Sequence, residues 1–246
     1  MAKKRVSLTL EEEMVEKIDA EAEERELNRS QTVEEIAEKY FGERGIDTAV
    51  VFCGDPEAKS LELHNGKPVL SHILDHLAEE GINRAILLSG KNKEIEESFG
   101  SEYSGLALEY IEDEPEGTAA ALKKVEGKVD GEFAALNGHV IADVDMDEML
   151  RFHREESSVA TIALTSVEDP SSYGVARLKG RKVLGFVEKP EDGEEPSRLI
   201  NAGTYIFGSE IFSMLEEESI ETVFKNLADQ KQLSGYIYGG KWRNWD

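Results

Sequence analysis

The sequence contains a single cysteine, Cys53, among its 246 residues. One cysteine excludes an internal disulfide framework and any zinc site built from several cysteines, which favours a reducing compartment. Long apolar runs are also lacking. The run at 159–164 is far shorter than the roughly 18 residues that cross a bilayer. The basic residues at the N-terminus are followed by acidic sequence and not by the apolar core of a signal peptide. We therefore expect a cytoplasmic protein with no membrane partner.

Basic residues are scarce, since 28 Lys and Arg stand against 52 Asp and Glu, for a formal net charge of −24. The 39% hydrophobic content still allows a folded core beneath a heavily ionised surface. An acid excess spread over the whole chain is typical of proteins from a salt-rich cytoplasm. At molar salt the electrostatic screening length falls to about 3 Å, so the acidic side chains no longer repel one another appreciably. We expect a halophilic source, with an ordinary acidic protein as the alternative.

The pattern changes near 42–45, which predicts a small domain at 1–45 and a larger one at 46–246. Residues 5–10 of the small domain alternate between polar and apolar, as in a strand with one apolar face. A lone strand has two unpaired edges, and about 45 residues bury little core. We therefore expect this strand to pair with its copy in a homodimer.

Two amphipathic helices are predicted after this strand. A capping box of Thr9 and Glu12 opens the first helix, which runs to about residue 25. The second helix has its N-cap within 28–30 and ends at Gly42. The small domain is thus predicted as strand, helix, turn and helix.

This arrangement resembles the ribbon-helix-helix family of DNA-binding dimers. The resemblance implies that paired strands enter the major groove of double-stranded DNA and that the second helix starts at a phosphate. It implies DNA contacts by Arg5, Ser7, Thr9, Ser30 and Gln31. The basic cluster of Lys3, Lys4 and Arg5 favours DNA binding as well, and we include Lys3, Lys4 and Arg29 among the candidate contacts. Acidic residues at 11–13 weigh against DNA contact, so a module that only dimerises is the alternative.

The larger domain alternates short apolar strands with helical stretches. We predict an α/β fold with an open, mostly parallel, Rossmann-like sheet, to which a β-rich half is added, and ligands at the carboxyl ends of the strands. The predicted strands lie at 47–52, 84–88, 132–136 and 160–164, the helices at 69–80 and 144–156, and the added strands at 174–179, 182–188 and 203–207.

Motifs in this domain resemble those of the sugar-1-phosphate nucleotidyltransferases, over nearly all of 46–246. The resemblance implies a mixed, mostly parallel sheet and a site where a nucleoside triphosphate meets a sugar phosphate. It also implies a glycine-rich triphosphate loop, phosphate-binding lysines and two aspartates that hold magnesium. The matching motifs lie at 65–70, 116–119, 136–138, 169–175, 186–190, 201–205 and 238–246.

The resemblance also supplies candidate ligand-binding residues. Lys59 matches a phosphate-binding lysine, and Gly117 and Thr118 match the nucleoside-side loop. Glu188, Lys189, Asn201 and Gly203 match the sugar-phosphate pocket, whereas Gly138, His139 and Asp246 fall at the metal-binding motifs.

Three departures from the family pattern stand out. The segment after Cys53 is about ten residues too short for the triphosphate loop, His139 stands where the first metal aspartate belongs, and the sequence ends at Asp246. Imidazole is a poor magnesium ligand. A softer ion shared with Asp143 or Asp145 is the alternative to simple loss of the metal site.

These observations together predict a dimeric DNA-binding transcriptional regulator. Its large domain is expected to be catalytically inactive, without metal or other cofactor, and to bind a nucleotide or sugar phosphate, because phosphoryl transfer depends on the missing groups. The first alternative is an active sugar-1-phosphate nucleotidyltransferase that uses magnesium and dimerises through the small domain. The second is a scaffold for protein partners.

Overall fold

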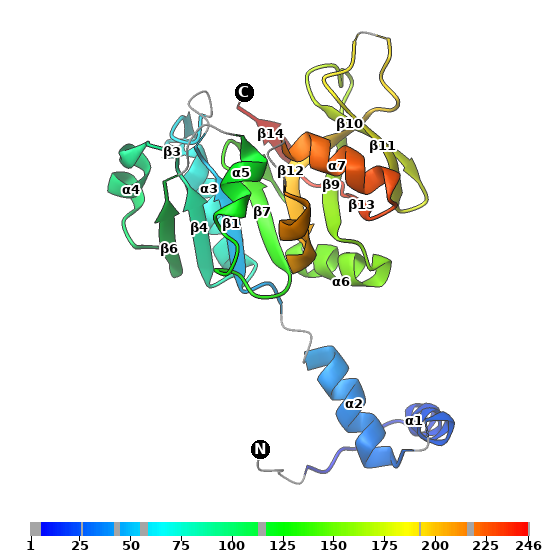
Figure 1. Cartoon of the computed structure of the whole chain (residues 1–246). Helices are drawn as coiled ribbons and strands as arrows, with labels where there is room; N and C mark the ends of the chain where they lie inside the picture. The colour runs from blue at the N-terminus through cyan, green and yellow to red at the C-terminus, as the bar shows by residue number, and fades with distance from the viewer. Residues whose placement is uncertain are drawn as a thin grey trace. The chain divides into compact units, whose positions relative to one another are not determined.

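The computed structural model describes residues 6–25, 27–41, 45–54, 59–112, 117–191, 193–215 and 219–245. The chain forms two compact units, Met1–Arg44 and Gly45–Asp246, each with its own helices (Figure 1). Among the described residues, the helices are too short or too polar to span a bilayer.

The small unit contains two helices, α1 (Glu12–Glu24) and α2 (Arg29–Phe41). A reciprocal cap starts α2: the Gln31 backbone N–H donates to Asn28 Oδ1 at 3.1 Å, and the Asn28 N–H donates to Gln31 Oε1 at 3.0 Å. Ile18, Ala22 and Thr32 are buried between these helices. Both predicted helices and the N-cap at 28–30 are therefore confirmed.

Two predictions for the small unit are wrong for the single chain. Residues 6–10 form no strand in the single chain; a strand needs a hydrogen-bonded neighbour, and the prediction expects that neighbour in a second copy. The capping box of Thr9 and Glu12 is absent, since α1 takes Glu11 as its N-cap without a side-chain hydrogen bond. Arg5 lies outside the described residues.

The large unit alternates strands and helices along the chain. Its first half contains β1 (Thr48–Phe52), β2 (Leu63–His64), β3 (Lys67–Pro68), α3 (Val69–Glu79), β4 (Arg84–Leu88), α4 (Lys93–Phe99), β5 (Glu102–Tyr103), β6 (Leu106–Ile111), α5 (Thr118–Lys123) and β7 (Phe133–Asn137). Its second half contains β8 (Val140–Ala142), α6 (Met146–Glu156), β9 (Ala160–Ser166), β10 (Gly174–Lys179), β11 (Lys182–Glu188), β12 (Leu199–Phe207), the 3₁₀ helix η1 (Ser209–Met214), α7 (Ile220–Asp229), β13 (Leu233–Ile237) and β14 (Trp242–Asn244).

Ten strands form one sheet in the order β10-β11-β13-β9-β12-β7-β1-β4-β6-β5. The strands β7, β1, β4 and β6 are mutually parallel, and β13 is parallel to β9. The other neighbours are antiparallel, including β12 against both β7 and β9. The α/β fold and the mixed sheet are thus confirmed, whereas the expectation that most neighbouring strands are parallel is wrong.

Helices cover both faces of this sheet (Figure 1). In β1, Ala49 and Val51 face the cluster formed with α3, α4 and α6, while Val50 faces the cluster formed with α5, α7 and η1. Successive side chains of a strand point to opposite faces, so continuous apolar runs indicate strands buried on both sides.

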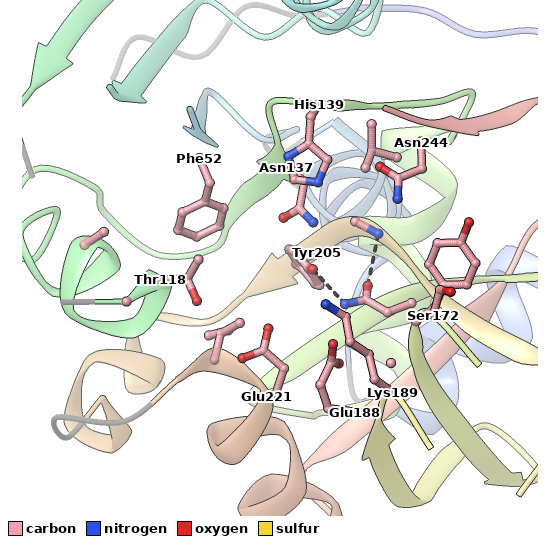
Figure 2. A pocket seen from close by; sticks show the side chains of 18 of the residues that line it. Phe52, Thr118, Asn137, His139, Ser172, Glu188, Lys189, Tyr205, Glu221 and Asn244 are labelled. Atoms are coloured by element: carbon pink, nitrogen blue, oxygen red, sulfur yellow. Dashed lines mark hydrogen bonds between the residues drawn. The ribbon is translucent and has the colours of Figure 1, made fainter. Parts of the chain in front are cut away.

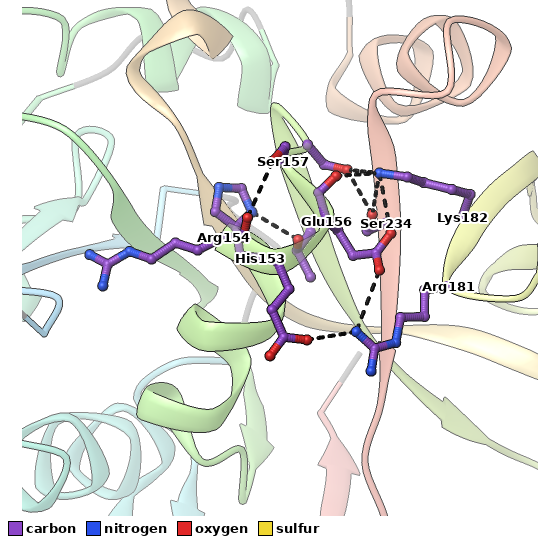
Figure 3. Close-up of polar contacts among 10 residues, drawn as sticks. His153, Arg154, Glu156, Ser157, Arg181, Lys182 and Ser234 are labelled. Carbon is purple, nitrogen blue, oxygen red and sulfur yellow. Dashed lines mark hydrogen bonds and ion pairs between the residues drawn. The ribbon is translucent and has the colours of Figure 1, made fainter. Parts of the chain in front are cut away.

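A polar cluster ties the end of α6 to β11 and β13 (Figure 3). Lys182 Nζ donates to Ser158 Oγ at 2.6 Å and to the Glu156 carbonyl at 2.7 Å, and the hydroxyls of Ser158 and Ser234 lie 2.7 Å apart. Ser158 and Ser234 are buried, so these bonds satisfy polar groups that water reaches poorly. The cluster fixes the β-rich half against the helix.

His153 lies beside this cluster and is buried, with Nδ1 2.8 Å from Thr161 Oγ1. Burial lowers the pKa of His153; the charges of Glu132 and Glu210 oppose this effect, and those of Arg154 and Lys182 add to it.

We expect the free energy of unfolding to fall with acidification below about pH 6.5, because the unfolded chain then binds a proton that folded His153 resists. The His153 contribution is bounded by about 1.4 kcal/mol per pH unit. Urea unfolding at several pH values gives the free energy of unfolding as a function of pH for the unchanged chain and for His153→Gln. The difference between the two slopes measures the His153 contribution. Equal slopes would contradict the assignment.

Candidate functional site

A pocket of about 420 Å³ opens at the carboxyl ends of the parallel strands. Phe52, Leu88 and Asn137, the last residues of β1, β4 and β7, all line it (Figure 2). The edge at these strand ends is where α/β sheets bind ligands.

The turn after β7 is pressed against the end of β1. The Gly138 N–H donates to the Phe52 carbonyl at 2.8 Å, and a Cβ at position 138 would lie only 2.7 Å from both that carbonyl oxygen and Cys53 Sγ. Only glycine fits at such a distance. Gly138 therefore sets the positions of Asn137 and His139 on either side of it.

The opposite wall comes from the β-rich half. Asn201 Nδ2 donates to the Tyr205 hydroxyl at 2.8 Å, and the Gly203 N–H donates to Asn201 Oδ1 at 3.0 Å. Glu188 is the last residue of β11 and Lys189 follows it, and both side chains point into the same space (Figure 2). This wall presents an amide, a phenol, a carboxylate and an ammonium group to a ligand.

Lys189 has an uncommon backbone conformation, with φ of +43°. Non-glycine residues in this left-handed region cost about 1 kcal/mol or more, and such strain concentrates at functional sites. The Lys189 N–H donates to the Tyr173 carbonyl at 3.1 Å, which holds the strained turn in place. The turn directs the Lys189 side chain into the pocket.

Charge within the pocket is mixed. Partial desolvation by the pocket walls raises the pKa of Glu188, the charge of Glu221 adds to this effect, and Lys189 opposes it. Complete burial raises the pKa of the Tyr205 phenol, which remains a neutral hydrogen-bonding group at physiological pH.

The structure brings most of the sequence-predicted ligand residues to this one pocket. Gly117, Thr118, His139, Glu188, Lys189, Asn201 and Gly203 line it, and Gly138 lies directly behind it. Lys59 lines a separate cavity with Cys53 and Asn92. The shortened loop at 55–58 and Asp246 lie outside the described residues.

The sequence-predicted set does not include several other residues that line the pocket. Asn137, Tyr173, Tyr205, Trp242 and Asn244 stand inside the matching motifs and could have been found there, whereas Glu221 on α7 carries no spacing signal. The oversight at Asn244 matters most, because pairing of β14 with β8 places Asn244 opposite Val140, next to His139.

Among the described residues, the corner of the pocket at positions 139 and 244 does not fit a magnesium ion held by carboxylates. His139 and Asn244 lie together at the upper edge in Figure 2; they supply an imidazole and an amide, whereas magnesium prefers carboxylate oxygens. Across the described ranges, no three His, Cys, Asp or Glu side chains gather as a metal site would require. The softer-ion alternative with Asp143 or Asp145 finds no support there.

The predicted DNA-contacting residues of the small unit divide into three groups. Lys3, Lys4 and Arg5 lie outside the described residues, and Ser7, Thr9 and Ser30 are exposed. Arg29 donates from Nε and Nη2 to the Asp19 carboxylate at 2.7 and 2.5 Å, and Gln31 takes part in the cap of α2. The hydrogen bond from Arg29 lowers the pKa of Asp19.

Comparison with family models gives two matches. A model described as nucleotidyl transferase matches residues 56–245, and one described as ribbon-helix-helix protein, copG family, matches residues 4–43. The first range contains every pocket residue from Gly117 to Asn244.

Curated relatives point to the same chemistry. The chain is 35% identical to a mannose-1-phosphate guanyltransferase of Gibberella zeae over 189 residues, which are 72% of this chain and 51% of the relative. It is 35% identical to a mannose-1-phosphate guanylyltransferase of Mycobacterium tuberculosis over 190 residues, 73% of this chain and 52% of the relative. The chain thus spans about half the length of these relatives.

Solved structures share the fold. A putative glucose-1-phosphate thymidylyltransferase from Bacillus anthracis superposes with a TM-score of 0.73 at 22% identity, covering 80% of this chain and 89% of that one. A UDP-glucose pyrophosphorylase in complex with UDP-glucose gives a TM-score of 0.70 at 20% identity, covering 80% and 92%.

These findings contradict the prediction of a DNA-binding transcriptional regulator with a catalytically inactive large domain. The relatives are enzymes, and the similarity to them covers most of the chain. The prediction gave decisive weight to the shortened loop and to His139. Missing groups at two motifs do not establish inactivity when the rest of the pocket is assembled.

Gly138→Ala should destabilise the large unit by about 1 to 3 kcal/mol, because the new methyl group meets backbone and sulfur atoms that cannot withdraw without moving β1. Thermal or urea unfolding measures the change. The matched control is Gly185→Ala, whose Cβ would meet nothing closer than 3.7 Å. Equal stability of the two variants would show that the β1–β7 contact is looser than described.

Proposed function

Because this chain belongs to the nucleotidyl transferase family, we propose that it transfers a nucleotidyl group from a nucleoside triphosphate to a sugar 1-phosphate. An oxygen of the sugar phosphate attacks the α-phosphorus, a new P–O bond forms, the bond to the β-phosphoryl oxygen breaks, and pyrophosphate leaves. Mannose 1-phosphate and GTP are the proposed substrates, following the names of the relatives.

The observation that carries this proposal is the meeting of two walls at one pocket. The parallel strand ends supply Asn137 and the neighbouring Thr118 on one side, and the β-rich half supplies Glu188 and Lys189 on the other. A sugar phosphate needs a cation for its phosphate and polar groups for its hydroxyls. Lys189 provides the cation and the adjacent Glu188 provides a polar group for the hydroxyls.

Each polar group of the sugar wall has a proposed role. The Lys189 ammonium binds the phosphate of the sugar, since a point charge suits a phosphate oxygen. Glu188 accepts hydrogen bonds from sugar hydroxyls, and the bond between Asn201 and Tyr205 fixes the amide that faces the ring. Positioning and electrostatic stabilisation supply most of the rate in phosphoryl transfer.

The protein incubated with mannose 1-phosphate and magnesium-complexed GTP should form GDP-mannose and pyrophosphate in equal amounts. Lys189→Ala should lower kcat/KM about a hundredfold, because it removes the charge that orients the phosphate. Anion-exchange chromatography and a pyrophosphate assay measure the two products. The matched control is Lys225→Ala, a change on the exposed side of α7. Failure to form a sugar nucleotide from any common nucleoside triphosphate and hexose 1-phosphate would refute the proposal.

The small unit is proposed to join two copies of the chain. Val6, Leu8 and Leu10 are 71%, 64% and 43% exposed, although they form one apolar face of an alternating segment. Exposed apolar side chains at every second position favour pairing with the same segment of another copy, which would bury them and satisfy both strand edges. This proposal agrees with the ribbon-helix-helix match.

Replacing Val6, Leu8 and Leu10 together by serine should convert the dimer into a monomer, because the buried apolar face is lost. Light scattering after size-exclusion chromatography measures the mass. Ser7→Ala with Thr9→Ala alters the other face of the same segment and should leave the dimer intact. A monomeric unchanged chain at micromolar concentration would overturn the proposal.

A further inference from the structure

His139 and Asn244 form one corner of the pocket, at the upper edge of Figure 2. His139 follows β7 through the closely packed Gly138, and Asn244 ends β14. Their strands are adjacent, since Asn244 lies opposite Val140 in the β8–β14 pair. Two segments more than a hundred residues apart in the sequence therefore deliver an imidazole and an amide to the same place.

The backbone around this corner is fixed. The Trp245 N–H donates to the His139 carbonyl at 3.1 Å, and Trp242 Nε1 donates to the Ala202 carbonyl at 3.3 Å. The Trp245 ring stacks edge-on against His64 with 5.0 Å between centroids, and the Arg243 guanidinium lies 4.8 Å above it. The backbone that carries His139 and Asn244 is therefore held in place by hydrogen bonds and ring contacts, as a preorganised binding site requires.

The acidic side chains of the described pocket lie elsewhere. Glu188 and Glu221 stand on the far wall in Figure 2, near α7 and β11, and the Lys189 ammonium stands with them. Of the described side chains, those that a phosphate meets at the His139 and Asn244 corner are an imidazole and an amide, not carboxylates. Two carboxylates there would repel a phosphate unless a cation lay between them, whereas imidazole and amide donors need no such cation.

On the basis of the proposed function, we propose that His139 and Asn244 bind the phosphate of the sugar phosphate directly through their side-chain N–H groups, without a protein-held divalent cation. The corner acts as a pair of N–H donors to the phosphate. Lys189 contributes the positive charge from the facing wall. The pocket should therefore hold mannose 1-phosphate equally well when divalent metal is absent.

Isothermal titration of the full chain with mannose 1-phosphate tests this inference, once with excess EDTA and once with magnesium chloride at matched ionic strength. The two dissociation constants should agree within about twofold, which is well under the tenfold that corresponds to one lost contact. The double variant His139→Asp with Asn244→Asp should bind at least about tenfold more weakly in EDTA, because two carboxylates repel the phosphate. Magnesium should restore its affinity.

Two further variants separate this role from a structural one. Asn226→Asp adds a negative charge on the exposed side of α7, outside the pocket, and should change neither constant. His139→Asn keeps an N–H donor and should retain binding in EDTA, even where the double variant fails to fold by circular dichroism. Binding by the unchanged chain only in magnesium would overturn the inference and leave the proposed function standing. Absence of binding in both buffers would overturn both.

Discussion

The contact between the ends of β1 and β7 is the constraint on which the site depends. Gly138 approaches the Phe52 carbonyl so closely that a single methyl group would collide with it and with Cys53. This contact aligns the turn after β7, and β8 and β14 pair immediately beyond it. The parallel pairing of β1 and β7 brings Phe52 and Asn137 together at the carboxyl ends of the strands. Glycine at position 138 then sets the position of His139 beyond these strand ends.

The antiparallel strand β12 contributes residues to the second wall of the pocket. Because β12 runs antiparallel to β7, its Asn201–Tyr205 segment lies beside the carboxyl end of β7 instead of at the opposite edge. A second close contact orients this wall: a Cβ on Gly174 would lie 2.4 Å from the Phe186 ring and 2.7 Å from the Glu188 carboxylate. A wholly parallel sheet would provide only the edge formed by the ends of β1, β4 and β7. The mixed sheet adds the facing wall that carries Glu188 and Asn201.

Much of this architecture could be predicted from the sequence, since apolar runs such as 84–88 and 160–164 locate strands without reference to their partners. Strand direction could not, because it is decided by which distant strands pair. The segment 6–10 shows the same limit, as its alternation indicates a strand that one chain cannot complete. Motif comparison gathered Glu188 and Lys189 correctly in one pocket, but reading the end of the chain through Asp246 overlooked Asn244, which only the β8–β14 register places beside His139.

The overall charge of the chain bears on the phosphate contacts proposed for His139 and Asn244. A chain with a net charge of −24 repels a phosphate at long range, and salt limits that repulsion to about 10 Å at 0.1 M. Binding must therefore come from groups in contact with the ligand. Glu188 and Glu221 already place two carboxyl groups in the pocket against the single described cation, Lys189. Further carboxylates at positions 139 and 244 would make the pocket itself more repulsive to a phosphate, whereas the imidazole and the amide at these positions add no negative charge.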